Sequence, residues 1–290
     1  MRPQSPPWSA PDLSERRRTA LITLLADEDP AIYQIARKAI LSCGLAAGGW
    51  LHPHALSSDP VLRRRAREII GHFARQDADL RFIAFCLQHG EQFDLETAAW
   101  QLAATAYPDI CIEGYRALLD GYAAELKGRI DFSNRAPSVL GAVNQYLFDE
   151  LGFRGGDPSN ADLEACYFNR VVDRRSGDPI NLCLFYLLLA RRLHLPVAGI
   201  GLPGYFLCRY QSSSDELYVD VYHRGRLLTK ADCIQSQIQH AHELPADFLA
   251  PISARRLLTQ ICANLHQAYL QLALSEEATR VQRYLVALRG

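Results

Sequence analysis

The chain has 290 residues, of which 49% are hydrophobic and 22% are charged, and its formal net charge is −1. This composition is that of an ordinary globular protein, with enough material for one large domain or two smaller ones. The near-zero charge gives no global field that selects nucleic acid or an anionic membrane, and no apolar run reaches the ~20 residues that span a bilayer.

The first seven residues also lack the apolar core of a signal peptide, so we expect a soluble, cytoplasmic protein. Its eight cysteines are scattered without a Cys-x-x-Cys pair, which favours buried free thiols in a reducing compartment. The closest approaches to metal-ligand spacing are His52-x-His54 and His240-x-His242. Neither has a neighbouring Cys or carboxylate cluster, so we predict no metal and no cofactor.

An internal repeat marks residues 1–78. Asp29-Pro30 is followed 30 residues later by Asp59-Pro60, and apolar residues match at the same offset. An Asp before a Pro at the first helical position is a helix-start signal. The pattern resembles short HEAT-like repeats, whose helix pairs stack to bury a shared face. Two copies are few for a free-standing solenoid, so we expect them to pack on the following domain, as a partner-binding surface or as a stabilising extension.

Residues 79–250 begin with further helices, because apolar residues recur there at i, i+3 and i+4. A glycine-rich loop follows at 152–160. It lacks the Lys and Ser/Thr of a phosphate-binding P-loop, so it predicts a turn into the next helix. The predicted helical segments are 94–100, 113–126 and 136–151.

The most informative segment runs from Arg174 to Tyr186. It passes through a turn into a helix with apolar residues on every face, and such a helix must be buried. Short strand-like runs follow, one with Pro203 to Leu207 and the next with Tyr218 to Tyr222. A buried helix that leads into an antiparallel sheet is the frame of a papain-like or transglutaminase-like core.

Residues 251–290 predict two amphipathic helices, 254–274 and 276–288, with a short break at Ser275. The pair resembles a single tetratricopeptide-type hairpin. One hairpin cannot form a peptide groove of its own, because such repeats need neighbours to bury their faces. We therefore expect it to dock against the core.

The order of these segments resembles the bacterial transglutaminase-like proteins of the SirB type, over roughly residues 80–240. In transglutaminases proper, a nucleophilic Cys opens the buried helix, a His lies on the first strand after it, and an Asp lies on the next strand. The resemblance puts Asn181 or its immediate neighbours at the Cys position, Tyr205 at the His and Asp220 at the Asp, so only the Asp is kept. The matching segments are Phe168 to Val172, Gly177 to Leu182, Ala190 to Leu193, Pro203 to Leu207, and Asp220 with Gly225.

This departure bears on activity, because a thiolate nucleophile needs a base or a cationic partner at neutral pH. Tyr205 is a poor base, with an ordinary pKa near ~10. The resemblance implies that Tyr205 and Asp220 face the helix start, where they form a vestigial polar cluster with Asn181. Such a cluster can be a structural hydrogen-bond network, a binding pocket without catalysis, or a working site.

Cys183 is the alternative nucleophile. We expect it in the first turn of the buried helix, where the helix dipole favours a thiolate. Its possible partner, His223, falls three residues after Asp220, so on a continuous strand it faces the other way. Only a bulge or a turn at Arg224-Gly225 brings it round. The competing interpretation is that Cys183 is a small buried hydrophobe.

The sequence thus predicts a mostly helical α+β protein. A HEAT-like helical region (1–78) packs on a degenerate transglutaminase-like core (79–250) with a small antiparallel sheet, and a helical hairpin (251–290) follows. We predict a non-catalytic protein-interaction or regulatory module, that is, a pseudoenzyme. The alternative is a cysteine-dependent amidase, peptidase or transglutaminase-like enzyme that uses Cys183. We expect a protein partner and no membrane, and the arginine runs at 16–18 and 63–67 fit solvent faces of helices better than a nucleic-acid site.

Overall fold

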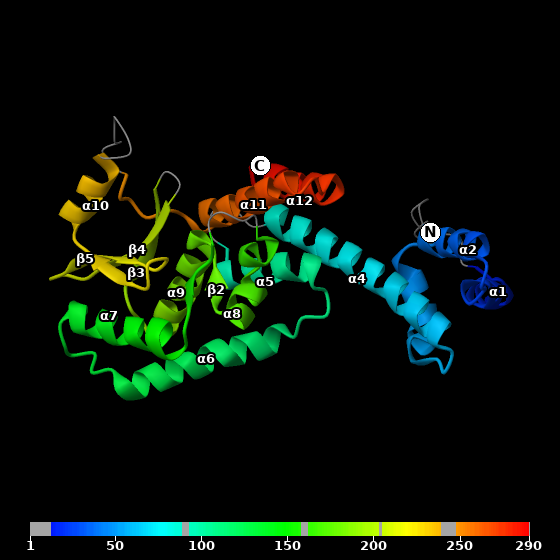
Figure 1. Cartoon of the computed structure of the whole chain (residues 1–290), viewed down its shortest axis with the longest axis horizontal. Coiled ribbons are helices and arrows are strands. Elements are labelled where there is room, and N and C mark those ends of the chain that lie inside the picture. The colour runs from blue at the N-terminus through cyan, green and yellow to red at the C-terminus, as the bar shows by residue number, and fades with distance from the viewer. Residues whose placement is uncertain (1–12, 89–92, 158–161, 203–204, 239–247, 290) are drawn as a thin grey trace, which may run out of the picture. The chain divides into compact units, whose positions relative to one another are not determined.

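The computed structural model describes all residues except 1–12, 89–92, 158–161, 203–204, 239–247 and 290. It separates into two compact units (Figure 1). The first is built from residues 1–81 and 104–109, and the second from 82–103 and 110–290. The structure is mostly helical with small sheets, which confirms the predicted α+β class.

The first unit is helical, and two of its helices begin with the predicted signal. Asp29 Oδ1 accepts from the Ala31 N–H at 2.8 Å, and Asp59 Oδ1 accepts from the Val61 N–H at 2.8 Å. Each Asp therefore caps the helix that begins at the following Pro. The elements are α1 (Glu15–Leu25), α2 (Pro30–Ser42), η1 (Leu45–Ala47), α3 (Gly48–Leu51), η2 (His52–Leu56) and α4 (Pro60–Gln88).

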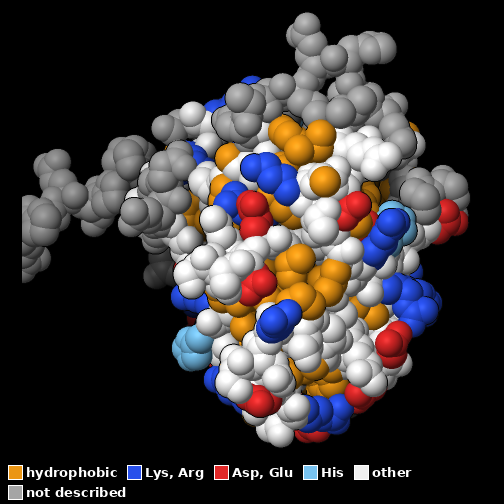
Figure 2. Space-filling view, turned by 90° about the vertical axis from the view of Figure 1, so that its left-hand side faces the viewer, with side chains coloured by type: hydrophobic (Ala, Val, Ile, Leu, Met, Phe, Trp, Pro, Cys, Tyr) orange, Lys and Arg blue, Asp and Glu red, His pale blue; other side chains and the backbone are white. Residues whose placement is uncertain are grey.

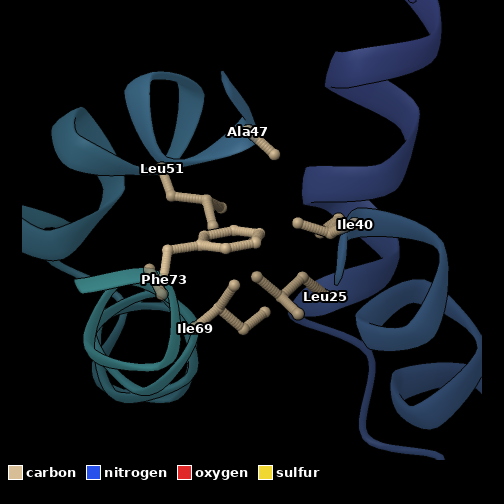
Figure 3. Packing of buried hydrophobic residues seen from close by; sticks show 7 residues of the cluster. Leu25, Ile40, Ala47, Leu51, Ile69 and Phe73 are labelled. Atoms are coloured by element: carbon tan, nitrogen blue, oxygen red, sulfur yellow. The ribbon is translucent and has the colours of Figure 1, made fainter. Parts of the chain in front are cut away.

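The first unit also has an apolar core of its own (Figure 3). Apolar side chains from its helices point toward one another around the ring of Phe73, and Leu25, Ile40 and Ile69 are fully buried there. The remaining core members are Ala47, Leu51 and Ala66.

Helix α4 departs from a short-repeat pattern, because it is a single helix of 29 residues. The predicted boundary between residues 78 and 79 falls inside this helix, and the helix supplies residues to both units. The repeated helix start is observed, while the HEAT-like assignment stays a prediction.

The second unit surrounds one buried helix, α9 (Pro179–Arg192). Ten of its 14 residues are buried, as the all-apolar pattern predicts. The ring of Phe185 stacks on Phe153 with centroids 4.2 Å apart. The other helical elements are α5 (Leu95–Ala106), α6 (Ile112–Arg129), α7 (Ala136–Asn144), the π-helical turn η3 (Gln145–Glu150), η4 (Leu163–Cys166), α8 (Phe168–Arg174), α10 (Lys230–Ile238), α11 (Ala254–Gln271) and α12 (Ser275–Arg289).

A four-stranded antiparallel sheet follows α9 in the chain, with strand order β3-β4-β5-β6. On one face of the sheet Ile200, Leu207 and Tyr218 pack with Cys233 of α10. On the other face Cys208 contacts Cys183 of α9. A two-residue parallel pair, β1 with β2, lies just before α9. The strands are β1 (Arg154–Gly155), β2 (Ser176–Gly177), β3 (Val197–Leu202), β4 (Tyr205–Gln211), β5 (Glu216–Asp220) and β6 (Arg226–Leu228). The predicted Pro203 and Gly204 lie outside the described residues.

Helices α11 and α12 pack against each other as a hairpin, close to the predicted ranges. Ser253 caps α11, and the hydroxyls of Tyr269 and Tyr167 are 2.7 Å apart, so α11 also contacts the segment before α8. The tetratricopeptide-type assignment of the hairpin stays a prediction.

The surface shown in Figure 2 mixes apolar, basic and acidic side chains, without one field of a single sign. In the described part of the chain, no helix has both the length and the apolar character needed to cross a membrane.

Candidate functional site

Tyr205 and Asp220 meet at one end of the sheet. Tyr205 begins β4, Asp220 ends β5, and the pairing of Cys208 with Val219 sets the register between these strands. Continued by one pair, this register brings residue 220 beside residue 207, on the same face as residue 205. The Tyr205 hydroxyl donates to Asp220 Oδ1 at 2.5 Å.

His223 closes this pair into a cluster of three side chains. Its Nδ1 lies 2.9 Å from Asp220 Oδ2 and 2.6 Å from the Tyr205 hydroxyl oxygen. If Nδ1 carries the proton, Asp220 accepts on both carboxylate oxygens and Tyr205 both donates and accepts. Nε2 is then the ring nitrogen with a free lone pair. The His223 side chain is 61% exposed, whereas that of Asp220 is 9% exposed.

A tight turn at residues 221–225 brings His223 to this position. The Gly225 N–H donates to the Asp220 carbonyl at 2.8 Å, and the His223 N–H donates to Asp220 Oδ1 at 3.1 Å. Gly225 has φ of 73° and Arg224 has φ of 57°, both in the left-handed region. The turn at Arg224-Gly225 that the sequence left open is therefore observed, and it directs His223 toward Tyr205 and Asp220.

Asn144, the last residue of α7, holds this turn in place. Its Nδ2 donates to the Gly225 carbonyl at 2.6 Å, and its Oδ1 accepts from the Tyr186 hydroxyl at 3.0 Å. A Cβ at position 225 would lie 2.5 Å from Asn144 Cγ and 2.5 Å from Phe148 Cε2, so only glycine fits. Phe148 belongs to the π-helical turn, a feature often found at functional sites.

The neighbouring Tyr222 fixes the other side of the turn. Its hydroxyl donates to the Gly156 carbonyl at 2.6 Å. A Cβ at Gly155 would lie 2.6 Å from the Tyr222 ring, so the ring packs directly on the backbone of β1. The position of His223 is thus determined by contacts on both sides of it.

Asn181 lies at the start of α9 and has different partners. Its backbone N–H and its Nδ2 donate to Asp178 Oδ1 at 2.7 and 3.0 Å, and Nδ2 also lies 3.4 Å from the Cys166 carbonyl. The side chain is buried, and its Oδ1 has no partner among the described residues. The structure therefore joins Tyr205 to Asp220 by hydrogen bonds, while those of Asn181 go to Asp178 and Cys166.

Burial dominates the electrostatics of the site. It raises the pKa of the Tyr205 hydroxyl well above the ordinary value, and the hydrogen bond to Asp220 and the Asp220 charge act in the same direction. Tyr205 therefore stays a neutral donor. Burial also raises the pKa of Asp178 to about 6, against the hydrogen bonds from Asn181 and Asn264, which lower it.

Cys183 is the fifth residue of α9, which corrects the expectation that it lies in the first turn. Its side chain is fully buried. Its Sγ lies 3.2 Å from Cys208 Sγ and 3.5 Å from the Leu207 carbonyl. Burial, together with the neighbouring Cys183, raises the pKa of the Cys208 thiol. In the described structure, the hydrogen bonds of His223 go to Tyr205 and Asp220, and none goes to Cys183.

The cluster contains two of the three kinds of group that an acyl-transfer triad uses. An imidazole oriented by a carboxylate can accept a proton at Nε2 or hydrogen-bond a ligand. Acyl transfer also needs a nucleophile within hydrogen-bond reach of that imidazole. No Cys, Ser or Thr side chain of the described residues is hydrogen-bonded to His223. The geometry therefore supplies a base and an orienting acid without the third member.

Two residues of the site, Asn144 and Asp178, were not singled out from the sequence. Asp178-Pro179 repeats the helix-start signal of Asp29-Pro30, so that pattern could have identified the cap. Asn144 lies in a helical segment with no local signal, and its role depends on a contact with Gly225, 81 residues away in the chain.

The structure contains no candidate metal centre in the part that it describes. No group of three or more His, Cys, Asp or Glu side chains comes together there. His52 and His54 lie in η2, and His240 and His242 are outside the described residues.

Comparison with known proteins adds the family context. The family described as the transglutaminase-like superfamily matches residues 113–263, just over half of the chain. A UPF0162 protein of Xylella fastidiosa is 32% identical over 185 residues, which are 62% of this chain and 66% of that protein. A UPF0162 protein of Pseudomonas aeruginosa is 29% identical over 190 residues, or 63% of this chain and 67% of that one.

A shorter similarity extends beyond bacteria. F-box only protein 21 of Mus musculus is 30% identical over 135 residues, 44% of this chain but only 21% of the mouse protein. No solved structure matches the chain. The chain thus spans about two thirds of its bacterial relatives, and its similarity to the mouse protein is limited to one segment of that longer protein.

Proposed function

Because the chain belongs to the transglutaminase-like superfamily and the resemblance puts Asn181 or its immediate neighbours at the nucleophile position, we propose that its core is a non-catalytic protein-interaction or regulatory module. The observation that carries the proposal is the environment of Asn181. A carboxamide is not an acyl-transfer nucleophile, and this one is 1% exposed and bonded to the cap Asp178.

The cluster at the end of the sheet fits the same proposal. Asp220 accepts hydrogen bonds from Tyr205, from His223 Nδ1 and from the His223 backbone, so its oxygens are satisfied within the protein. A buried carboxylate with these partners stabilises the turn without any chemistry. The similarity of part of this chain to 21% of F-box only protein 21 supports the proposal, because a segment of this kind is found there within a longer chain.

The experiment that tests this proposal is a turnover assay on the purified protein. The assay would use a glutamine peptide with a fluorescent primary amine for transamidation, and a peptide p-nitroanilide for hydrolysis. We expect the wild type to match a Cys183→Ser/His223→Ala double variant in both reactions. Turnover by the wild type that either single substitution removes, at unchanged thermal stability, contradicts the proposal.

The second candidate is a cysteine-dependent amidase, peptidase or transglutaminase-like enzyme that uses Cys183. Its supporting observation is that a histidine oriented by Asp220 is present in the core after all. Against it, Cys183 is fully buried beside Cys208, and its hydrogen bonds go to Leu207 and Cys208. Our first proposal, the non-catalytic module, also includes the SirB-type assignment, a protein partner and a cytoplasmic location.

A further inference from the structure

We propose that a groove along the outer edge of β3 binds an extended, acidic peptide segment of a partner, which adds to the sheet as a further strand. This rests on the proposed interaction function and specifies the chemistry of its partner. The edge groove, as we name it, has a volume of about 770 Å³. Among the residues that line it are Leu187, Arg191, Leu195, Val197, Ile252 and Leu257.

One outward backbone group of β3, the Val197 carbonyl, is open on this groove. The Gln211 N–H donates to the Pro196 carbonyl, which sets the hydrogen-bond alternation along β3. The backbone N–H and carbonyl groups of its even-numbered residues therefore point toward β4, and those of Val197 and Gly199 point to the outer edge. The Val197 N–H bonds locally to the Leu195 carbonyl at 2.9 Å. The Val197 carbonyl has no partner in the described structure, so it is available to an incoming N–H.

The chain itself already forms an isolated β-bridge with the same edge. The Ile252 N–H donates to the Gly199 carbonyl at 2.9 Å, and Pro251 forms an antiparallel bridge with Ile200. Ser253 then caps α11, so the chain leaves the edge before it reaches Val197. The edge therefore accepts extended backbone, and its remaining part is uncovered in the described structure. This is the geometry of peptide recognition by strand addition.

The walls of the edge groove favour an apolar side chain beside the added backbone. Gly199 lets the side chains of Leu187 and Leu257 approach closely, since a Cβ there would lie 3.3 Å from each. Leu195 and Ile252 complete an apolar lining. A buried apolar anchor supplies affinity, and the backbone hydrogen bond supplies orientation.

The charge of the edge groove selects an acidic partner. Its described lining contains Arg191, Arg209 and His194 but no Asp or Glu. Arg209 is engaged, because it donates to the Leu249 carbonyl and pairs with Glu216. Arg191 is 66% exposed and uses only Nη1 in its pair with the neighbouring Asp94, so its other nitrogens can meet a carboxylate. An acyl chain is a poorer candidate ligand than a peptide, because it has no N–H to donate to the Val197 carbonyl.

Fluorescence anisotropy with labelled hexapeptides tests the proposal on the full-length protein. The probes are Val-Ile-Val-Val with Asp-Asp before or after it, the two Lys-Lys counterparts, and versions N-methylated at the central residues. We expect at least one acidic peptide to bind, and its lysine counterpart to bind about fivefold or more weakly. N-methylation should weaken binding about tenfold, because it removes the donor to β3.

A charge swap provides the matched control. Arg191→Glu should reverse the preference, so that the lysine peptide binds better than the acidic one, whereas Arg64→Glu, an exposed arginine of the first unit, should leave the preference unchanged. Equal binding of the N-methylated and unmodified peptides means apolar adsorption and overturns the proposal. So does the absence of binding by both acidic peptides. Neither result affects the turnover assay, so the two proposals fail separately.

Discussion

At the scale of single residues, Asp220 is the acceptor on which the cluster depends. Asp220→Ala leaves the Tyr205 hydroxyl and His223 Nδ1 without their shared partner, so we expect the free energy of unfolding to fall by roughly 1–3 kcal/mol. Tyr205→Phe removes the hydroxyl that hydrogen-bonds both Asp220 and His223, and it should lower the free energy of unfolding by about 1–2 kcal/mol. Urea unfolding followed by circular dichroism measures both. A fall of less than about 0.5 kcal/mol for Asp220→Ala contradicts a structural role for the cluster.

Asp178 gives the protein a pH dependence of defined sign. Its pKa is raised from 3.8 to about 6 by burial, so between these values the folded state binds more protons than the unfolded state. Stability should therefore fall as pH rises from about 4 to about 6, by up to about 3 kcal/mol, and then level off. Asp178→Asn keeps a capping side chain and should abolish this slope. An unchanged slope in urea titrations across this pH range assigns the effect to other groups.

The buried thiols should resist alkylation in the native state. Cys183 and Cys208 are both fully buried, whereas Cys111 is exposed and provides an internal control. We expect iodoacetamide to label Cys111 and to leave Cys183 and Cys208 unlabelled until the protein is denatured, as peptide mass spectrometry would show. If Cys183 is labelled faster than Cys111 at pH 6, the result would support the hypothesis that Cys183 is the nucleophile of an enzyme.

At the scale of elements, the turn at residues 221–225 depends on Gly225. In Gly225→Ala the new Cβ would lie 2.5 Å from atoms of Asn144 and Phe148, and the alanine would have to adopt a left-handed backbone conformation. We expect a loss of about 2–4 kcal/mol in the free energy of unfolding. The matched control is Gly121→Ala in α6, where a Cβ meets nothing within 4 Å and where the change should stabilise by up to about 1 kcal/mol. Similar values for the two variants contradict the role given to the turn.

The strongest elements were predictable because their signals are local. The apolar pattern on every face predicted α9, and the Asp-Pro pairs at 29–30 and 59–60 predicted the starts of α2 and α4. The helix predicted over 136–151 instead passes from α7 into a π-helical turn, where the Leu151 N–H bonds the Tyr146 carbonyl. Its apolar spacing continues through both parts, so the sequence carries no mark of the change.

The site was predictable only in part. Strand alternation brings Tyr205 and Asp220 to one face, and the structure joins them. The sequence could not show that Asn181 hydrogen-bonds Asp178 rather than Tyr205 or Asp220, because that depends on how the start of α9 packs. The position of His223 depends on two consecutive residues with left-handed backbone and on a hydrogen bond from the distant Asn144. Neither feature leaves a recognisable pattern in the sequence.

At the scale of the whole molecule, α4 supplies residues to both units. It places Ile69 and Phe73 in the first core and buries Phe82 and Phe85 in the second unit. We therefore expect a fragment of residues 1–78 to lack a cooperative thermal transition, because it ends inside this helix. Circular dichroism of the fragment beside the full chain measures this. A melt that matches that of the full chain would show an autonomous domain.

Helix α4 also imposes an order of events during synthesis. The ring of Phe82 packs edge-on against Tyr284, with centroids 4.9 Å apart. Ribosomes add about 5–20 residues per second, so the ~200 residues between these two partners take about 10–40 s to translate. During that interval all the helices of the first core have been synthesised. The ring of Phe82, in the second half of α4, does not yet have Tyr284 to pack against. We therefore expect the second half of α4 to be accessible to chaperones during this interval.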